Sequence, residues 1–128
     1  MNSLPIDSQI TFVYTVDLAK SSRFYEEALG FPLALDQGAC RIYRVLGPGA
    51  YIGICQSEEA PEDGAGLIFT LVTPDVDGWY ERIIARGWAC EHPPRHNATY
   101  RIYHFFLRDP SGYRIEIQRF ERDDWDSA

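Results

Sequence analysis

The sequence predicts an α+β fold made of two tandem βαβββ modules, and two observations support this prediction. The order strand, helix, strands occurs twice, with helical spans of near-equal length at Asp17–Gly30 and Asp75–Gly87. The apolar triplets also correspond, because Ile52-Gly53-Ile54 stands in the first half where Ile115-Glu116-Ile117 stands in the second. A half of roughly 55 residues with one helix cannot cover both faces of its sheet, so we expect a paired fold or a dimer.

The chain of 128 residues is expected to be a single domain, 1–128. Module one covers about 7–57, a linker 58–66, module two about 67–120, and an acidic tail 121–128. No stretch reaches the run of about 18 apolar residues that a membrane span needs. The first residues lack the basic start and the apolar stretch of a signal peptide. We therefore expect a cytoplasmic protein with no membrane partner.

Charge and cysteine content narrow the classes of function. Twelve basic residues against 19 acidic ones give a formal net charge of −7, which argues against a nucleic-acid partner. Cys40, Cys55 and Cys90 are an odd number at unrelated spacings, so reduced thiols in a reducing compartment are expected. An aromatic content of 14% with this acidity suits a pocket for flat or cationic small molecules, although most rings should lie in the core.

Module one shows its elements in a simple order. Ile10–Thr15 is rich in β-branched and aromatic residues and predicts a strand. Asp17 can cap the helix that follows, and a glycine stands where a left-handed C-cap is expected. Cys40–Leu46 and Ala50–Gln56 predict two further strands, because Gly47-Pro48-Gly49 between them is a strong hairpin signal.

Module two repeats this order. Leu67–Val72 predicts a strand, Asp75 can cap the next helix, and Gly87 can end it. A proline-rich loop is expected at His92–Asn97, ahead of two C-terminal strands.

Those two strands should meet at the turn Asp109-Pro110-Ser111-Gly112. Aspartate can bond its own backbone, proline fixes φ, and glycine accepts positive φ. In the second strand, alternation places Ile115 and Ile117 on one face and Glu116 on the other. Glu116 therefore either lines a cavity or meets solvent.

A set of motifs in this order resembles the vicinal oxygen chelate superfamily, which includes glyoxalase I, extradiol dioxygenases, fosfomycin-resistance enzymes and bleomycin-resistance proteins. The resemblance covers nearly the whole chain and implies a cupped mixed β-sheet with helices on the outer face, and a homodimer. One such scaffold hosts several chemistries. The motifs are Asp17-Leu18, Phe24-Tyr25, Leu29-Gly30-Phe31, Asp75-Val76-Asp77, Gly87, Asp109-Pro110-Ser111-Gly112-Tyr113 and Ile115-Glu116-Ile117.

In metal-dependent members of that superfamily, imidazole and carboxylate ligands project into the cup. The resemblance places their seats here at or near Ile10, Gly53, Ile68 and Glu116. Only Glu116 among these can bind a metal, whereas three or four ligands are normally needed. The resemblance thus implies a degenerate metal site. No cofactor is expected, and a divalent metal, if bound, would be held by Glu116 with His104.

The histidines leave alternatives open. His92 and His96 have the spacing of a helical metal pair, but Pro93-Pro94 forbids a regular helix, so exposed loop residues are expected. His104 either approaches Glu116 from the cup face or is a packed strand residue, because a one-residue register shift reverses its facing. Glu116 itself could be a structural carboxylate, a ligand-orienting group or a general base.

Without metal ligands the cup would be apolar, and Gly53 would leave room in it. The alternative is that the residues of the cup simply fill the space between the sheets.

The sequence leaves three candidate functions. The favoured one is a metal-free protein similar to the bleomycin-resistance branch that binds an aromatic or cationic compound. The second is a divalent-metal-dependent lyase or dioxygenase that uses His104 with Glu116. The third is a metal-independent isomerase or lyase with Glu116 as base. The expected cup and ligand-binding residues are Ile10, Phe12, Tyr14, Gly53, Cys55, Ile68, His104 and Glu116. Arginines at 41, 44 and 101 would instead favour an anionic substrate.

Overall fold

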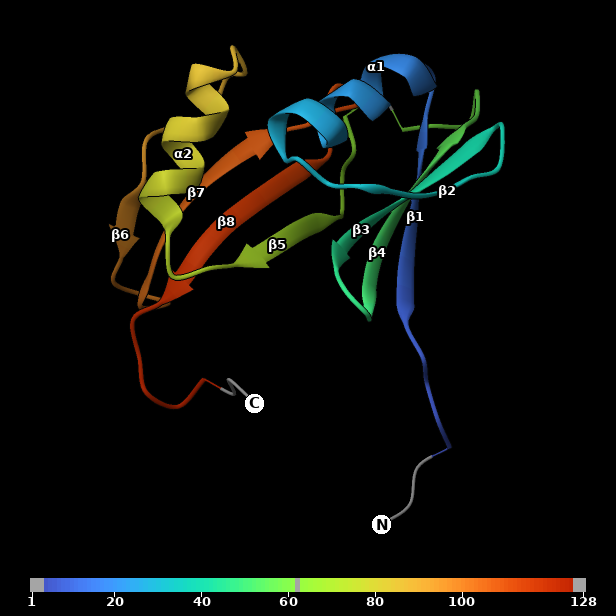
Figure 1. The fold of residues 1–128 in the computed structure, drawn as a ribbon. Coiled ribbons are helices and arrows are strands. Elements are labelled where there is room, and N and C mark those ends of the chain that lie inside the picture. Colours follow the sequence, from blue (N-terminus) through green and yellow to red (C-terminus); the bar gives the residue numbers. More distant parts are fainter. Residues whose placement is uncertain (1–3, 62, 126–128) are drawn as a thin grey trace. The chain divides into compact units, whose positions relative to one another are not determined.

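The computed structural model describes residues 4–61 and 63–125, and it divides into two compact units, Met1–Glu62 and Asp63–Ala128 (Figure 1). Each unit has one four-stranded mixed sheet and one helical segment, in the order βαβββ. The predicted α+β fold of two tandem modules is thereby confirmed. No helix in the described ranges is long and apolar enough to cross a bilayer.

Module one forms a sheet in the order β1-β4-β3-β2, with β1 parallel to β4. The three strands expected in this half are confirmed. The position of the fourth strand of the module, β2, was not predicted, because all of its residues are exposed and it shows no alternation of buried and exposed positions. The elements are β1 (Gln9–Thr15), α1 (Leu18–Arg23), a π-helical segment η1 (Phe24–Ala28), β2 (Leu33–Asp36), β3 (Cys40–Leu46) and β4 (Ala50–Gln56).

The helical span of module one begins as predicted and then changes its winding. Asp17 accepts a hydrogen bond from the backbone N–H of Lys20 at 3.1 Å, so it is the expected N-cap. Regular α-helix ends at Arg23, and the π-helical segment that follows buries the adjacent rings of Phe24 and Tyr25. Sequence periodicity assumes 3.6 residues per turn throughout, and for that reason it missed the wider segment.

Module two forms a sheet in the order β5-β8-β7-β6, with β5 parallel to β8. Its helix packs against β7 and β8, and Phe105 of β7 meets the ring of Tyr80 edge to face at 5.3 Å. Ile115 and Ile117 are buried, as alternation predicted. The elements are β5 (Ile68–Val72), α2 (Val76–Ala85), β6 (Arg95–Asn97), β7 (Ile102–Arg108) and β8 (Arg114–Phe120).

The proline-rich segment is only partly the loop that was expected. The prolines do exclude a helix, but the residues after them pair with β7 as the short edge strand β6. The described part of the acidic tail contacts module two, because Trp125 stacks on Phe120 with ring centroids 4.2 Å apart. The last part of the predicted tail, 126–128, lies outside the described residues.

Two of the three cysteines are joined. Cys40 and Cys55 lie directly opposite each other on β3 and β4, with Cα atoms 4.1 Å apart, and form a disulfide. The expectation of reduced thiols is therefore wrong for this pair, since only strand register brings together residues that sequence spacing leaves unrelated. Cys90 is a free thiol, and burial raises its pKa to about 11.

The turn between β7 and β8 forms as the sequence predicted. One carboxylate oxygen of Asp109 accepts hydrogen bonds from the backbone N–H groups of Ser111 and Tyr113, both at 2.9 Å. Gly112 has φ of 89°, and a Cβ atom there would lie 2.9 Å from the backbone of Asp63. Glycine is thus required both by the backbone conformation and by the close approach of the preceding loop.

Candidate functional site

The polar residues of module two gather on one face of its sheet. We call this the open face of module two, meaning the face opposite α2. Period-2 alternation and strand register assign its members, because Thr70 and Phe106 both lie beside Glu116, and Arg108 lies beside Arg114. The residues used below are Thr70 of β5, His104, Phe106 and Arg108 of β7, and Arg114 and Glu116 of β8.

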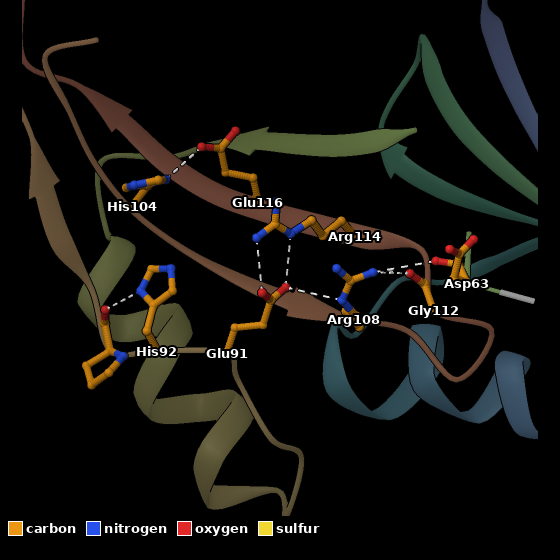
Figure 2. A network of polar contacts seen from close by, with 9 residues as sticks. Asp63, Glu91, His92, His104, Arg108, Gly112, Arg114 and Glu116 are labelled. Carbon is orange, nitrogen blue, oxygen red and sulfur yellow. Dashed lines mark hydrogen bonds and ion pairs between the residues drawn. The ribbon is translucent and has the colours of Figure 1, made fainter. Parts of the chain in front are cut away.

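Glu116 is held on this face by two hydrogen bonds. His104 Nδ1 lies 2.8 Å from one carboxylate oxygen (Figure 2). The hydroxyl of Thr70 donates to the other oxygen at 3.0 Å. The side chains of His104 and Glu116 are only 7% and 12% exposed. The question of whether His104 faces Glu116 is therefore answered: the two side chains meet. A buried polar pair held in this way has one defined geometry.

The hydrogen bond between His104 and Glu116 uses only one of the two imidazole nitrogens of His104. With Nδ1 directed at a carboxylate, His104 carries its proton there, and the lone pair of a neutral ring resides on Nε2. Among the described residues no hydrogen bond engages this Nε2. A histidine oriented in this way can accept a hydrogen bond or a proton, while Glu116 stabilises the cation that results.

His92 lies next to the pair and is not the exposed loop residue that was expected. It is half-buried, and its ring meets His104 edge to face at 5.8 Å and Phe106 at 6.0 Å. Its Nδ1 bonds the carbonyl of Pro93 at 2.8 Å, and its Nε2 is buried without a partner among the described residues. His96 is exposed as expected, but in β6, where it bonds Glu121.

A second polar network lies on the same face, nearer the turn that joins β7 and β8. Glu91 accepts two hydrogen bonds from Arg114, each at 3.1 Å, and it forms an ion pair with Arg108 at 3.5 Å (Figure 2). The guanidinium of Arg114 also stacks on Phe106, 3.9 Å from the ring centroid. The hydrogen bonds from Arg114 lower the pKa of Glu91. The ion pair therefore contributes to stability at neutral pH, and that contribution is lost as the pH falls below the ordinary glutamate pKa of about 4.3, through the folded value.

A cleft opens beside these arginines. It has a volume of about 600 Å³. It is next to the His104–Glu116 pair without including it, because Arg114 and Glu116 are two residues apart on one strand face. Its lining consists of the loop 63–67, Ile68, Arg108 and Arg114.

The other predicted site residues share the corresponding face of module one, opposite α1. Phe12 and Tyr14 are half exposed, and the ring of Phe12 covers Gly53, so a Cβ atom at position 53 would clash with that ring. The room expected above Gly53 is therefore filled by Phe12. Cys55 lies beside Tyr14, within the disulfide.

This contact gives a stability prediction. Gly53→Ala should lower the free energy of unfolding by about 1 kcal/mol, because the new methyl group must displace the half-exposed Phe12 ring. Urea unfolding of Gly53→Ala, Phe12→Leu and the double variant measures the effect as a cycle. Phe12→Leu should remove most of the penalty, and equal penalties in both backgrounds would show that the ring is not responsible.

Three of the four positions where the resemblance implies metal ligands carry no side chain that can bind a metal. Ile10, Gly53 and Ile68 offer no side-chain donor, and Glu116 and His104 are bonded to each other. Within 4–61 and 63–125 no three His, Cys, Asp or Glu side chains group so as to hold an ion.

Sequence reasoning named other arginines than those on the open face of module two. Arg41 pairs with Asp36 at 3.8 Å, Arg44 lies over Tyr51, and Arg101 occupies a turn with φ of 54°. A signal for the missed residues existed, because pairing across the Asp109–Gly112 turn places Arg108 opposite Arg114 and Phe106 opposite Glu116. Glu91 and His92 come from a loop and carried no such signal.

The chain is similar to proteins of one superfamily. The family model of the Glyoxalase/Bleomycin resistance protein/Dioxygenase superfamily matches residues 8–117, and no curated protein matches in sequence. A glyoxalase/bleomycin resistance protein/dioxygenase from Nocardioides is 22% identical over 100% of this chain and 91% of that one, with a TM-score of 0.71. One from Alicyclobacillus acidocaldarius is 22% identical over 91% and 93%, with a TM-score of 0.76. A lactoylglutathione lyase from Agrobacterium tumefaciens is 19% identical over 96% and 100%, with a TM-score of 0.72.

Proposed function

Because the chain belongs to the Glyoxalase/Bleomycin resistance protein/Dioxygenase superfamily, we propose that it binds a small organic molecule on the open face of module two. The observation that carries this proposal is the His104–Glu116 pair. It is a nearly buried, fully oriented polar group on the sheet face that the helix does not cover. A few fixed polar groups beside aromatic rings are typical of small-molecule sites.

The surroundings of the pair favour an aromatic ligand. The rings of His92, His104 and Phe106 meet one another edge to face, with centroids between 5.2 and 6.0 Å apart. A flat ring can add to such a cluster, while an N–H or O–H group of the ligand bonds the polar pair. The cationic ligand expected from the net charge is supported less, because Arg108 and Arg114 lie on the same face.

We further propose that the metal site of the superfamily has degenerated in this chain. Support comes from the side chains at Ile10, Gly53 and Ile68, and from the two oxygens of Glu116, which already accept hydrogen bonds from His104 and Thr70. Elemental analysis after incubation with Zn²⁺, Ni²⁺, Mn²⁺ or Fe²⁺ tests this. Near-stoichiometric metal that is lost in Glu116→Ala would overturn the proposal.

Binding itself is tested with matched variants. A thermal-shift screen of aromatic compounds, followed by calorimetry, should yield ligands that bind about tenfold more weakly to Glu116→Gln and His104→Gln, because each loses an oriented hydrogen bond to a charged group. His96→Gln is the control, since His96 lies on the opposite face of the sheet beside Tyr103. Ligands that bind all four proteins equally would place the site elsewhere.

A second candidate function is metal-free isomerisation or lyase chemistry. The observation that favours it is the orientation of His104, whose Nδ1 faces a carboxylate while Nε2 is left for substrate. In this version His104 accepts the proton, whereas the sequence suggested Glu116 as base. Ligands with an acidic C–H group, incubated in D₂O, would exchange that hydrogen with wild type and not with His104→Gln. Ligands that bind but exchange no hydrogen would contradict this second function and leave the proposal of a binding protein.

We also propose a homodimer, as is common in this superfamily. Support comes from the half-exposed Phe12 and Tyr14 on module one. Light scattering should give twice the mass of the chain for wild type, and a shift toward monomer for Phe12→Ser but not for Tyr100→Ser, an exposed turn residue of module two. A monomeric wild type would contradict this. The cytoplasmic location, without nucleic-acid or membrane partners, stays a prediction.

A further inference from the structure

Two arginines stand opposite each other at the turn end of the β7–β8 hairpin. Arg108 and Arg114 are register partners, so their side chains leave the same face of adjacent strands. Like charges in this arrangement repel each other and need a counter-anion. Glu91 supplies one carboxylate, which both guanidinium groups contact. A single shared carboxylate leaves an excess of donors over acceptors.

The unused donors can be assigned atom by atom. Arg114 binds Glu91 through Nε and Nη2, and Arg108 binds it through Nε. Arg108 Nη1 donates to the carbonyls of Gly112 at 2.9 Å and of Asp63 at 3.5 Å. In the described part of the chain, Arg108 Nη2 and Arg114 Nη1 have no hydrogen-bond acceptor. These contacts hold both planar groups in place and leave one nitrogen free on each.

Both arginines line the 600 Å³ cleft. Apart from Asp63, the rest of the lining is a chain segment whose side chains are uncharged, and its first three are small or absent. This segment consists of Gly64, Ala65, Gly66, Leu67 and Ile68. Asp63 is the one acidic residue among the cleft's lining residues, and a carboxylate oxygen of Asp63 accepts the backbone N–H of Ala65 at 3.0 Å within its own turn. The cleft thus has space for a ligand group and two fixed cations in its wall.

We propose that Arg108 and Arg114 form an anion-binding subsite that takes a carboxylate or phosphate group of the ligand. The inference rests on the proposed function, because the subsite adjoins the His104–Glu116 pair on the same face. Planar guanidinium groups bind the paired oxygens of such anions with defined geometry. The ligand would place its anionic end in the cleft and its ring beside His104, because the Arg114 guanidinium already stacks on Phe106. Its class is therefore an aromatic or otherwise apolar acid.

The test uses benzoate, phenyl phosphate and inorganic phosphate as probes, with benzamide as the neutral match of benzoate. Calorimetry at low ionic strength should show binding of at least one anion and about tenfold weaker binding of benzamide. Arg114→Gln and Arg108→Gln should each weaken anion binding about tenfold, and Arg114→Lys should recover part of it. Arg119→Gln is the control, because Arg119 lies on the other face over Tyr103. Preference between benzoate and phenyl phosphate identifies the anion.

Glu91→Gln separates a ligand subsite from a purely structural ion network. Removing the internal carboxylate frees donors on both arginines, so anion affinity should rise about threefold. Unchanged or weaker binding in this variant would mean that the arginines act only as counter-ions of Glu91, and would overturn the inference. Circular dichroism verifies that each variant is folded.

The result also distinguishes this inference from the proposed function. If neutral aromatic compounds bind in a manner that depends on His104 and Glu116, and anions bind no better, then only the subsite is wrong. If neither neutral nor anionic compounds bind, both proposals fail. Anion binding that is insensitive to Arg108→Gln and Arg114→Gln shows adventitious association and overturns the subsite.

Discussion

Asp109→Ala is expected to lower the free energy of unfolding by about 3 kcal/mol. The carboxylate of Asp109 is buried and accepts the backbone N–H groups of Ser111 and Tyr113. Alanine removes this acceptor and leaves donors of the turn without partners, at a cost of about 1–3 kcal/mol for each buried group. The turn joins the two strands that carry His104, Arg108, Arg114 and Glu116, so its loss loosens the whole candidate site. Urea denaturation followed by circular dichroism measures the change.

Asp109→Asn is the matched variant. The asparagine side-chain oxygen can still accept the same N–H groups, so the loss should be less than half that of the alanine variant. Equal losses for asparagine and alanine would show that the negative charge, and not hydrogen-bond acceptance, stabilises the turn. A loss below about 0.5 kcal/mol for alanine would contradict the assignment of Asp109 as the centre of the turn.

Reduction of the Cys40–Cys55 disulfide is expected to destabilise the protein by about 3 kcal/mol. The bond closes a segment with a sequence separation of 15 residues, and the cross-link limits the conformations of the unfolded chain. The effect should appear as a lower urea midpoint in the presence of a reductant. Mass spectrometry of alkylated protein measures how many thiols are free before and after reduction.

Two cysteine variants control this experiment. Cys40→Ser should show the lower stability with or without reductant, because its bond cannot form. Cys90→Ser should keep the full response to reductant, since Cys90 is outside the bond. Three alkylated thiols in the untreated wild type would show that the pair is reduced, as the odd number of cysteines first suggested.

The candidate functions differ in what they require of the same few side chains. A binder needs His104 and Glu116 as fixed hydrogen-bonding groups. An isomerase needs His104 Nε2 to exchange a proton with substrate. An anionic ligand needs Arg108 and Arg114 as well. These requirements separate in the variants, because His104→Gln affects all three functions whereas Arg114→Gln affects only the last.

Local rules predicted much of the fold. The caps at Asp17 and Asp75, the strands around the hairpin of module one and the Asp109–Gly112 turn all depend on residues within a few positions of one another. Alternation also placed Glu116 on the face away from Ile115 and Ile117. In each case, short-range backbone hydrogen bonding or side-chain period decides the structure, and both can be read along the chain.

Other features depended on contacts that no local pattern encodes. The strand β2 is short and exposed, and β6 follows two prolines, so neither shows the period of a buried strand. The disulfide needs the register of β3 and β4. The bonds of Glu91 with Arg114, and the contact of His92 with His104, join a loop to strands that are 12 to 23 positions away.

By itself, the sequence determined the repeated modules, their caps, the turn at Asp109 and the facing of Glu116, because these follow from backbone geometry over a few residues. Only the tertiary structure decided which groups surround Glu116 and what fills the space at Gly53. Strand register and loop path bring His104, Thr70 and His92 to one place and lay Phe12 over Gly53. The chemistry available to the site depends on those neighbours, and the neighbours are set by long-range pairing.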